Sequence, residues 1–229
     1  MAEMNTETTL EGKYDFDGLL HSYKVSAKHY HADNGLFDTK VFKKLMLTAK
    51  QTLSFCGVNA HHQNGIAENR IKDVATGTRT QLLHVAHRWP STIDASLWPT
   101  VLKNYMMLRN QIPNYYQPGK KEGRKYFDEK YVNSPLTKVS GEEKELNVKN
   151  IHPFGCPMYV LESKLQAQQS YNKWIDRARV GIYLCHSPNR SLDMPLVLNT
   201  APANVSPQFH CIYDDEFSTY KLNSKFKSF

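Results

Sequence analysis

The sequence predicts an α/β fold in its first half and a small all-β domain in its second half. Three observations predict this division. Up to about residue 112, apolar residues recur at helical spacing and alternate with short strand-like runs. Four short strand-like runs separated by turn residues follow Ile151. Between these parts, residues 113–150 carry Pro, Gly, Lys and Glu without a clean period.

The first elements expected are the end of a helix, a strand and a capped helix. Residues 17–23 are expected to end a helix, and residues 24–30 are expected to form a short strand. The strand leads to the turn signal Asp33-Asn34-Gly35. Asp38 is expected to cap a helix over residues 39–52. The apolar face of that helix comprises Val41, Phe42, Leu45, Met46 and Ala49.

A very short strand over residues 53–56 and a polar loop over residues 57–65 are expected next. A long helix over residues 66–87 follows, and Pro90 is expected to end it. Its apolar stripe comprises Ile71, Val74, Ala75, Thr78, Leu82, Val85 and Ala86. Another helix is expected over residues 95–110. Its core face comprises Trp98, Val101, Leu102, Tyr105 and Met106.

Composition divides the chain into five segments. They are a disordered N-terminus (1–15), the α/β part (16–112), a basic linker (113–150), a β domain (151–217) and a tail (218–229). In the β domain, strands are expected over residues 156–161, 179–185, 195–199 and 209–213, and their spacing suggests a small β-barrel. The linker holds the basic cluster Lys120, Lys121, Arg124 and Lys125. A solvated linker is one interpretation of this cluster, and phosphate contacts or a nuclear address are the others.

Charge and cysteine usage narrow the function classes. The chain has 29 Lys and Arg against 22 Asp and Glu, a net charge of +7, which favours polyanions such as nucleic acid. The four cysteines lie far apart and form no C-x-x-C pair, so a structural zinc site is not expected. They are expected to be reduced thiols of an intracellular protein. No apolar run is long enough for a membrane span. No Walker or G-x-S-x-G motif is present, so no small-molecule substrate is expected.

Two carboxylates lie next to glycine turns. Asp33 opens D-N-G, and Glu68 ends Q-N-G-I-A-E, 35 positions later. A strand end and a helix start can face each other across a sheet, so both carboxylates can point at one spot, where Mg²⁺ would relieve their repulsion. A pair of such ions could stabilise both the attacking and the leaving oxygen of a phosphoryl transfer. The alternative is that Asp33 bonds its own turn and that Glu68 only favours a helix start.

The strings around these acids resemble the integrase catalytic core of copia-type LTR retrotransposons. The first strings are H-x-D-N-G-x-F and G-V-x-A-H-H-Q-N-G-I-A-E. The match continues through L-L-H-x-A-x-x-W-P at residues 82–90, Leu97-Trp98 and Asn110. Phe154 to Val160 and Ser206 to His210 resemble the SH3-like barrel that follows the core in such polyproteins. The resemblance is collinear and covers residues 16–217.

This resemblance implies an RNase H-like fold, DNA as partner, Mg²⁺ or Mn²⁺ as cofactor and action as a homo-oligomer. Of the D,D(35)E triad, Asp33 matches the second acid and Glu68 the third, with 34 residues between them. Asn64 matches the loop before the catalytic helix. Lys72, four positions after Glu68, is the main candidate for a DNA phosphate contact. Further DNA-binding candidates are Arg70, Arg79, Lys120 and Lys121.

The sequence departs from the family at the first acid. The only acids before Asp33 are Glu3, Glu7, Glu11, Asp15 and Asp17, and no strand-hairpin-helix block precedes it. The zinc-binding module of the family is also missing. We therefore expect a truncated core with an open sheet edge, weak metal binding and no strand transfer by this chain alone.

Two other functions remain open from the sequence. One is a non-catalytic nucleic-acid-binding module that uses the net charge of +7, the basic linker and the barrel. The other is a structural or interaction protein without a DNA role, which would use the barrel or the open edge of the sheet. A relic that never folds stably is the last alternative.

Overall fold

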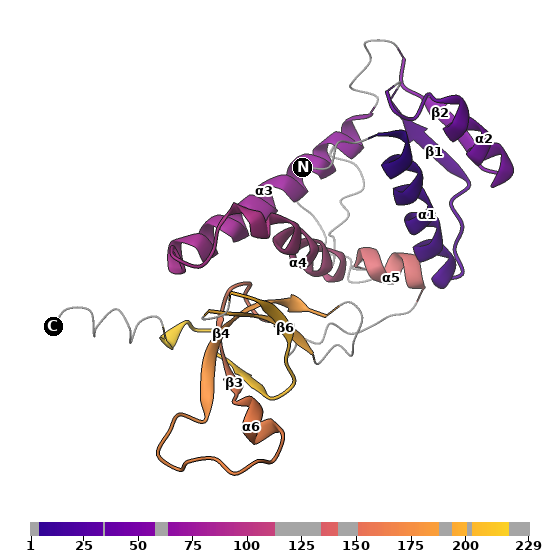
Figure 1. The fold of residues 1–229 in the computed structure, drawn as a ribbon. Coiled ribbons are helices and arrows are strands. Elements are labelled where there is room, and N and C mark those ends of the chain that lie inside the picture. Colours follow the sequence, from indigo (N-terminus) through magenta and orange to yellow (C-terminus); the bar gives the residue numbers. More distant parts are fainter. Residues whose placement is uncertain are drawn as a thin grey trace, which may run out of the picture. The chain divides into compact units, whose positions relative to one another are not determined.

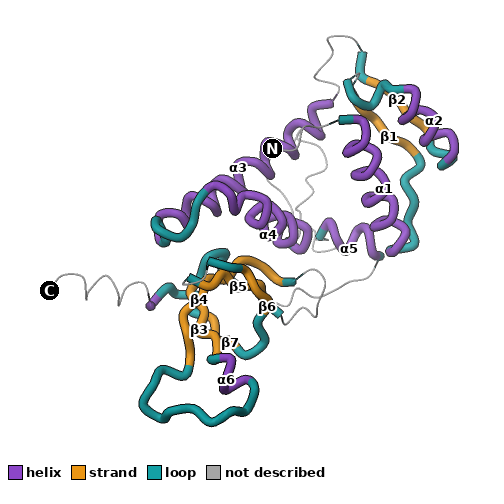
Figure 2. The backbone as a smooth tube through the Cα atoms, viewed as in Figure 1, coloured by secondary structure: helices purple, strands orange, loops and turns teal. Residues whose placement is uncertain are grey.

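The computed structural model describes residues 5–33, 35–57, 64–112, 134–141, 151–187, 194–200 and 203–219. Contacts between residues divide the chain into two compact units. Unit 1 comprises residues 1–73 and 110–144, and unit 2 comprises residues 74–109 and 145–229. Figures 1 and 2 show their elements. One boundary falls inside a long helix, so part of the expected α/β segment clusters with the expected β domain.

Unit 1 contains a parallel strand pair whose strands are joined through a helix. Its elements are α1 (Thr6–Ser22), β1 (His29–Ala32), α2 (Lys40–Thr48), β2 (Thr52–Phe55), the first nine residues of α3 (Gly65–Arg88) and α5 (Pro135–Ser140). Strands β1 and β2 are parallel, with His29 opposite Thr52 and Ala32 opposite Phe55. The expected strand over residues 53–56 is thus confirmed with a shift of one residue, whereas the expected strand over residues 24–30 lies several residues too early.

Helix α1 contradicts the expectation of a disordered N-terminus for residues 6–15. It begins at Thr6 and is capped reciprocally: Asn5 accepts from the Thr8 N–H through its side chain, and the Thr8 hydroxyl accepts from the Asn5 N–H. Only Lys13 and Leu20 of this helix are buried. Because so few apolar residues face the rest of unit 1, the sequence shows no clear helical stripe here.

Helix α2 is shorter than expected and has a different cap. The Thr39 hydroxyl, and not Asp38, accepts the Phe42 N–H at 3.2 Å, while Asp38 forms an exposed ion pair with Lys43. The helix ends at Thr48 instead of residue 52. Phe42 and Met46 are each 2% exposed, which confirms the centre of its predicted apolar face, whereas Val41 on that face is exposed.

Unit 2 contains an antiparallel sheet together with helical elements. Its elements are the remainder of α3, the 3-10 helix η2 (Ala95–Leu97), α4 (Trp98–Gln111), β3 (Pro157–Leu161), α6 (Ser163–Gln166), β4 (Ala178–His186), β5 (Pro195–Asn199), β6 (Val205–Pro207) and β7 (Cys211–Tyr213). The last residues of α4 belong to unit 1. The strand order is β6-β5-β4-β3-β7.

The sheet of unit 2 is open in the part of the chain that the structure describes. Strands β6 and β7 form its two edges and do not pair with each other, so the expected closed barrel is not present there. Four of the strands lie where the sequence predicted them, and β6 was not expected. Strand β6 has only three residues, one of them Pro207, and is too short to show a pattern of alternation.

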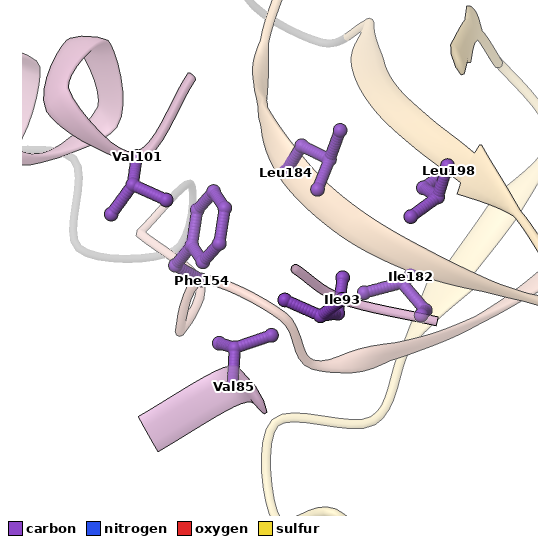
Figure 3. Packing of buried hydrophobic residues seen from close by; sticks show 7 residues of the cluster. All are labelled: Val85, Ile93, Val101, Phe154, Ile182, Leu184 and Leu198. Carbon is purple, nitrogen blue, oxygen red and sulfur yellow. The ribbon is translucent and has the colours of Figure 1, made fainter. Parts of the chain in front are cut away.

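The two faces of this sheet have separate cores. Ile182, Leu184 and Leu198 pack with Val85 of α3 and Val101 of α4, together with Ile93 and Phe154 (Figure 3). Tyr183 of β4 and Val197 of β5, the alternate residues of these strands, belong to a second cluster that also takes in residues of β3 and of the loops. The buried residues of that cluster are Cys156, Met158, Val160, Tyr183, Val197 and Phe217. This period of two is the pattern of a sheet that buries both faces.

Two of the strings that carry the family resemblance pack against each other in unit 2. Gly155 has a φ of +80°, and a Cβ placed on it would lie 2.3 Å from Cγ2 of Val85. The indole Nε1–H of Trp89 donates to the Gly155 carbonyl at 2.9 Å. Glycine at position 155 therefore permits both the turn and the close approach of α3. Packing thus explains Val85, Trp89 and Gly155 within these strings.

The bounds of the long helices agree with the sequence, but three residues that were expected on their buried faces are exposed: Ile71 and Ala75 of α3 and Trp98 of α4. Helix α3 runs from Gly65 to Arg88, against the expected 66–87, and η2 with α4 covers the expected 95–110. Ile71 was expected in the stripe of α3 but is 69% exposed. Burial in α3 begins further along, at Thr78 and Val85.

Some of the expected features lie outside the described ranges. They include the tip of the D-N-G turn at Asn34, the loop at 58–63, the basic cluster at 120–125 and nearly all of the tail. Within the described helices, none is both long and apolar enough to cross a membrane.

Candidate metal centre

Asp33 lies directly after the last residue of β1 and is exposed. Its Oδ1 accepts the Gly35 N–H at 3.4 Å, a long hydrogen bond within its own turn. Both the turn interpretation and the ligand interpretation are compatible with this geometry, since a weak bond to one oxygen leaves the carboxylate accessible to a cation.

Glu68 lies in the first turn of α3 and is also exposed. The order β1–α2–β2–α3 relates it to Asp33. Because β1 and β2 are parallel, their carboxyl ends lie at the same edge of the sheet. Asp33 follows the end of β1, and the connection to Glu68 leaves from the end of β2. Ligand sites in parallel α/β structures form at this edge.

Asp17 is the nearest acid before Asp33, but it has a structural role. Its carboxylate accepts from Lys13 Nζ at 2.5 Å, from the Tyr30 hydroxyl at 2.5 Å and from Gln51 Nε2 at 3.2 Å. Burial raises the pKa of Asp17, but the hydrogen bonds from these three side chains and the charge of Lys13 outweigh it and lower the pKa. Asp17 thus ties α1 to Tyr30 of β1 and to Gln51 directly before β2, and its carboxylate is occupied by these contacts.

The donors fit a hard cation in kind but not in number. Asp33 and Glu68 offer carboxylate oxygens, which Mg²⁺ prefers. In the described residues, no group of three or more His, Cys, Asp or Glu side chains is placed to hold a metal ion. Two carboxylates would leave the rest of the coordination to water, so an ion bound by both would be held weakly.

The predicted phosphate contacts differ in their relation to Glu68. Lys72 is exposed and lies one helical turn beyond Glu68, on the same face of α3. Arg70 is also exposed, but a residue two positions along a helix lies on a different face. Arg79 is exposed in the part of α3 that belongs to unit 2. Asn64 is half-buried directly before α3, and Lys120 and Lys121 lie outside the described residues.

A polar ladder on the β1–β2 pair was not foreseen from the sequence. Ser54 Oγ lies 2.8 Å from both His29 Nε2 and His31 Nδ1, and His31 Nε2 lies 3.5 Å from Cys56 Sγ. His29 Nδ1 lies 2.7 Å from Thr52 Oγ1. The signal in the sequence is the alternation H-x-H paired with T-x-S-x-C, which puts all five side chains on one face. The ladder joins the two strands by side chains.

Unit 2 contains a second titratable cluster, and its burial argues against nucleophilic chemistry. His152 Nδ1 lies 2.9 Å from Asp215 Oδ1, and the His152 ring stacks on Tyr213 with centroids 3.4 Å apart. Cys156 beside them is fully buried. Burial, followed by the neighbouring Asp215, raises the pKa of the Cys156 thiol well above its ordinary value, which disfavours the reactive thiolate.

No protein-family model matches this chain, and no curated protein matches it significantly. The resemblance to integrases consequently depends on the quoted motifs, their order and the placement of the two acids.

Proposed function

We propose that this chain is an integrase-derived polypeptide that binds DNA and uses Asp33 and Glu68 as two ligands of one divalent cation, Mg²⁺ or Mn²⁺. The observation that carries the proposal is the order of elements in unit 1. A parallel β1–α2–β2 unit leads into the long helix α3, with one acid at a strand end and the other in the first helical turn. This order supports an RNase H-like origin for unit 1, and the five antiparallel strands of unit 2 support an SH3-like origin for its sheet.

The chemistry implied by the resemblance is attack of a DNA 3′ hydroxyl on a target phosphodiester. A bound cation would neutralise charge on the phosphate, and Asp33 and Glu68 would position that cation. Lys72 would contact an adjacent phosphate from the same helical face as Glu68. The triad of the family requires three acids, and this chain supplies two. The chain alone is therefore expected to bind DNA without joining DNA ends. A homo-oligomer built from it is also expected not to join DNA ends.

A crossed measurement of DNA affinity tests this function. The affinity of duplex DNA is measured by fluorescence anisotropy for the wild type and for Asp33→Asn/Glu68→Gln, with Mg²⁺ and with EDTA. With Mg²⁺ the double variant should bind more weakly, because it cannot bridge the phosphate through a cation. With EDTA it should bind more tightly, because two negative charges beside the phosphate have been removed.

The matched control is Glu7→Gln/Glu11→Gln. Both residues are exposed on α1, and their substitution changes the net charge by the same amount. This control should bind a little more tightly under both conditions. If the effect of Asp33→Asn/Glu68→Gln has the same sign with and without Mg²⁺, the two acids do not hold a cation at the DNA. DNA binding that depends on salt but not on Mg²⁺ would instead identify the non-catalytic nucleic-acid-binding module.

A further inference from the structure

The loop between α6 and β4 presents a tryptophan almost completely to solvent. Trp174 is 94% exposed, and Ile175 beside it is 55% exposed. Figures 1 and 2 show this connection extending away from the sheet of unit 2. A large aromatic side chain that contributes nothing to the core is a candidate for binding.

Hydrogen bonds within the loop hold the backbone around Trp174 in place. The Trp174 N–H donates to Oδ1 of Asn172 at 3.0 Å, and the Ile175 N–H donates to the carbonyl of Asn172 at 3.3 Å, which closes a turn. The Tyr171 hydroxyl donates to the carbonyl of Asp176 at 2.8 Å. At the base of the loop, the Glu162 N–H donates to the Arg177 carbonyl at 2.9 Å. A preordered loop loses little conformational freedom when it binds.

The exposed charged side chains near the tryptophan in the sequence are three cations and one carboxylate, that of Asp176. Lys173 precedes the tryptophan, Arg177 follows three positions later, and Lys164 lies in α6 at the start of the same connection. All three are exposed, and none forms an ion pair with a carboxylate in the part of the chain that the structure describes. The exposed Trp174 ring lies between Lys173 and Arg177 in the sequence. This order suits a ligand in which planar bases alternate with negatively charged phosphates.

We propose that the Trp174 loop is a binding site for single-stranded nucleic acid, with a base stacked on the Trp174 indole and phosphates on Lys173 and Arg177. Stacking on aromatic side chains beside a basic backbone track is the usual mode for such ligands, and it requires no base sequence. The choice of nucleic acid as the polyanion rests on the proposed function. The site itself lies in unit 2, apart from Asp33 and Glu68 in the sequence, and can be tested separately.

The test measures binding of a fluorescein-labelled oligothymidylate to the full chain by anisotropy. Trp174→Ala should weaken binding by about 5- to 150-fold, whereas Trp174→Phe should retain most of the affinity. Lys173→Gln/Arg177→Gln should reduce the slope of log affinity against log salt by about 0.7 for each phosphate that is no longer neutralised. The control Phe209→Ala removes another aromatic ring of unit 2, 61% exposed, and should leave the affinity unchanged.

The other outcomes overturn the proposal in distinguishable ways. If Trp174→Ala binds the oligonucleotide as the wild type does, the loop is not the site, while the proposed function stands on its own metal-dependent test. If the wild type does not bind the oligonucleotide, the inference is wrong whatever the duplex measurement shows. If the wild type instead binds vesicles of phosphatidylserine and phosphatidylcholine through Trp174, the occupant is an anionic lipid surface. Because Trp174 is exposed, equal melting temperatures should show that all variants fold.

Discussion

Gly155 is held in a conformation and at a contact that suit only glycine. Its φ is +80°, and Val85 occupies the space in which a Cβ would lie. Gly155→Ala should lower the free energy of unfolding by about 2–4 kcal/mol, through the unfavourable backbone and the overpacking together. Urea denaturation measures this loss. Adding Val85→Ala should relieve part of the overpacking, so the losses of stability caused by the two substitutions should not add.

The control for this prediction is Gly12→Ala. Gly12 lies inside α1, and apart from the adjoining residues and the backbone of the helix itself, no atom lies within 4 Å of the point that a Cβ would occupy. Alanine there should stabilise the chain by up to about 1 kcal/mol, because it favours a helix interior. Equal effects of the two glycine substitutions would contradict the packing described for Val85 and Gly155.

Asp214 gives unit 2 a dependence on acid pH. Its Oδ1 accepts from the N–H and hydroxyl of Ser218 at 3.0 and 2.7 Å, and its Oδ2 accepts from both groups of Thr219 at 2.7 Å. Burial raises the pKa of Asp214, but these hydrogen bonds outweigh it and lower the pKa to about 2. Because the pKa is lower in the folded state than in the unfolded state, the carboxylate stabilises the fold at neutral pH. This stabilisation is lost as the pH falls from the ordinary pKa of an aspartate toward 2.

Asp214→Asn should therefore destabilise the chain at neutral pH and differ less from the wild type as the pH falls toward 2. Thermal unfolding at a series of pH values measures the difference. Glu216→Gln is the control, since Glu216 is exposed and only two positions away. A difference between Asp214→Asn and the wild type that stays constant from pH 7 to pH 2 would mean that the Asp214 hydrogen bonds do not depend on its charge.

At the scale of single residues, the sequence predicted the position of the acids but not the surroundings that decide their role. Asp33 at a strand end and Glu68 at a helix start follow from local patterns, and both are found there. The role of Asp17 depends on Tyr30 and Gln51, which are 13 and 34 positions away. No local pattern connects such residues, because the contact exists only after the strands have paired.

At the scale of elements, the cap of α2 separates two interpretations of one sequence. The expected cap was Asp38, and the structure uses Thr39. Thr39→Ala should lower the free energy of unfolding by about 1 kcal/mol, because the Phe42 N–H loses its acceptor, and Thr39→Ser should retain the cap. Asp38→Ala removes only an exposed ion pair and should have an effect of less than about 0.5 kcal/mol. Urea denaturation that gives Asp38→Ala the larger effect would favour Asp38 as the cap.

Long helices and buried strands were predictable, whereas short or exposed elements were not. Helices α3 and α4 and strand β5 have enough apolar residues in register to show their period. Helix α1 buries two residues in 17, so its period is invisible. Strand β6 has three residues and includes Pro207, so no alternation can develop.

At the scale of the whole molecule, composition placed a boundary at residues 113–150, and contacts place one inside α3 after Asp73. The reason lies in packing between distant parts of the sequence. Val85 of α3 contacts Gly155, and Trp89 donates to the same residue, 66 positions away. Such contacts attach the second half of α3 to the sheet of unit 2, and amino-acid composition cannot predict them.

The central claim is that Asp33 and Glu68 converge on one cation, and a metal titration of the full chain read by thermal unfolding tests it most directly. Mg²⁺ or Mn²⁺ at about ten times its dissociation constant should raise the free energy of unfolding by about 1.4 kcal/mol. The rise should persist in Glu7→Gln/Glu11→Gln and vanish in Asp33→Asn/Glu68→Gln. A melting temperature that no metal concentration raises, or a rise that survives in Asp33→Asn/Glu68→Gln, would contradict the claim.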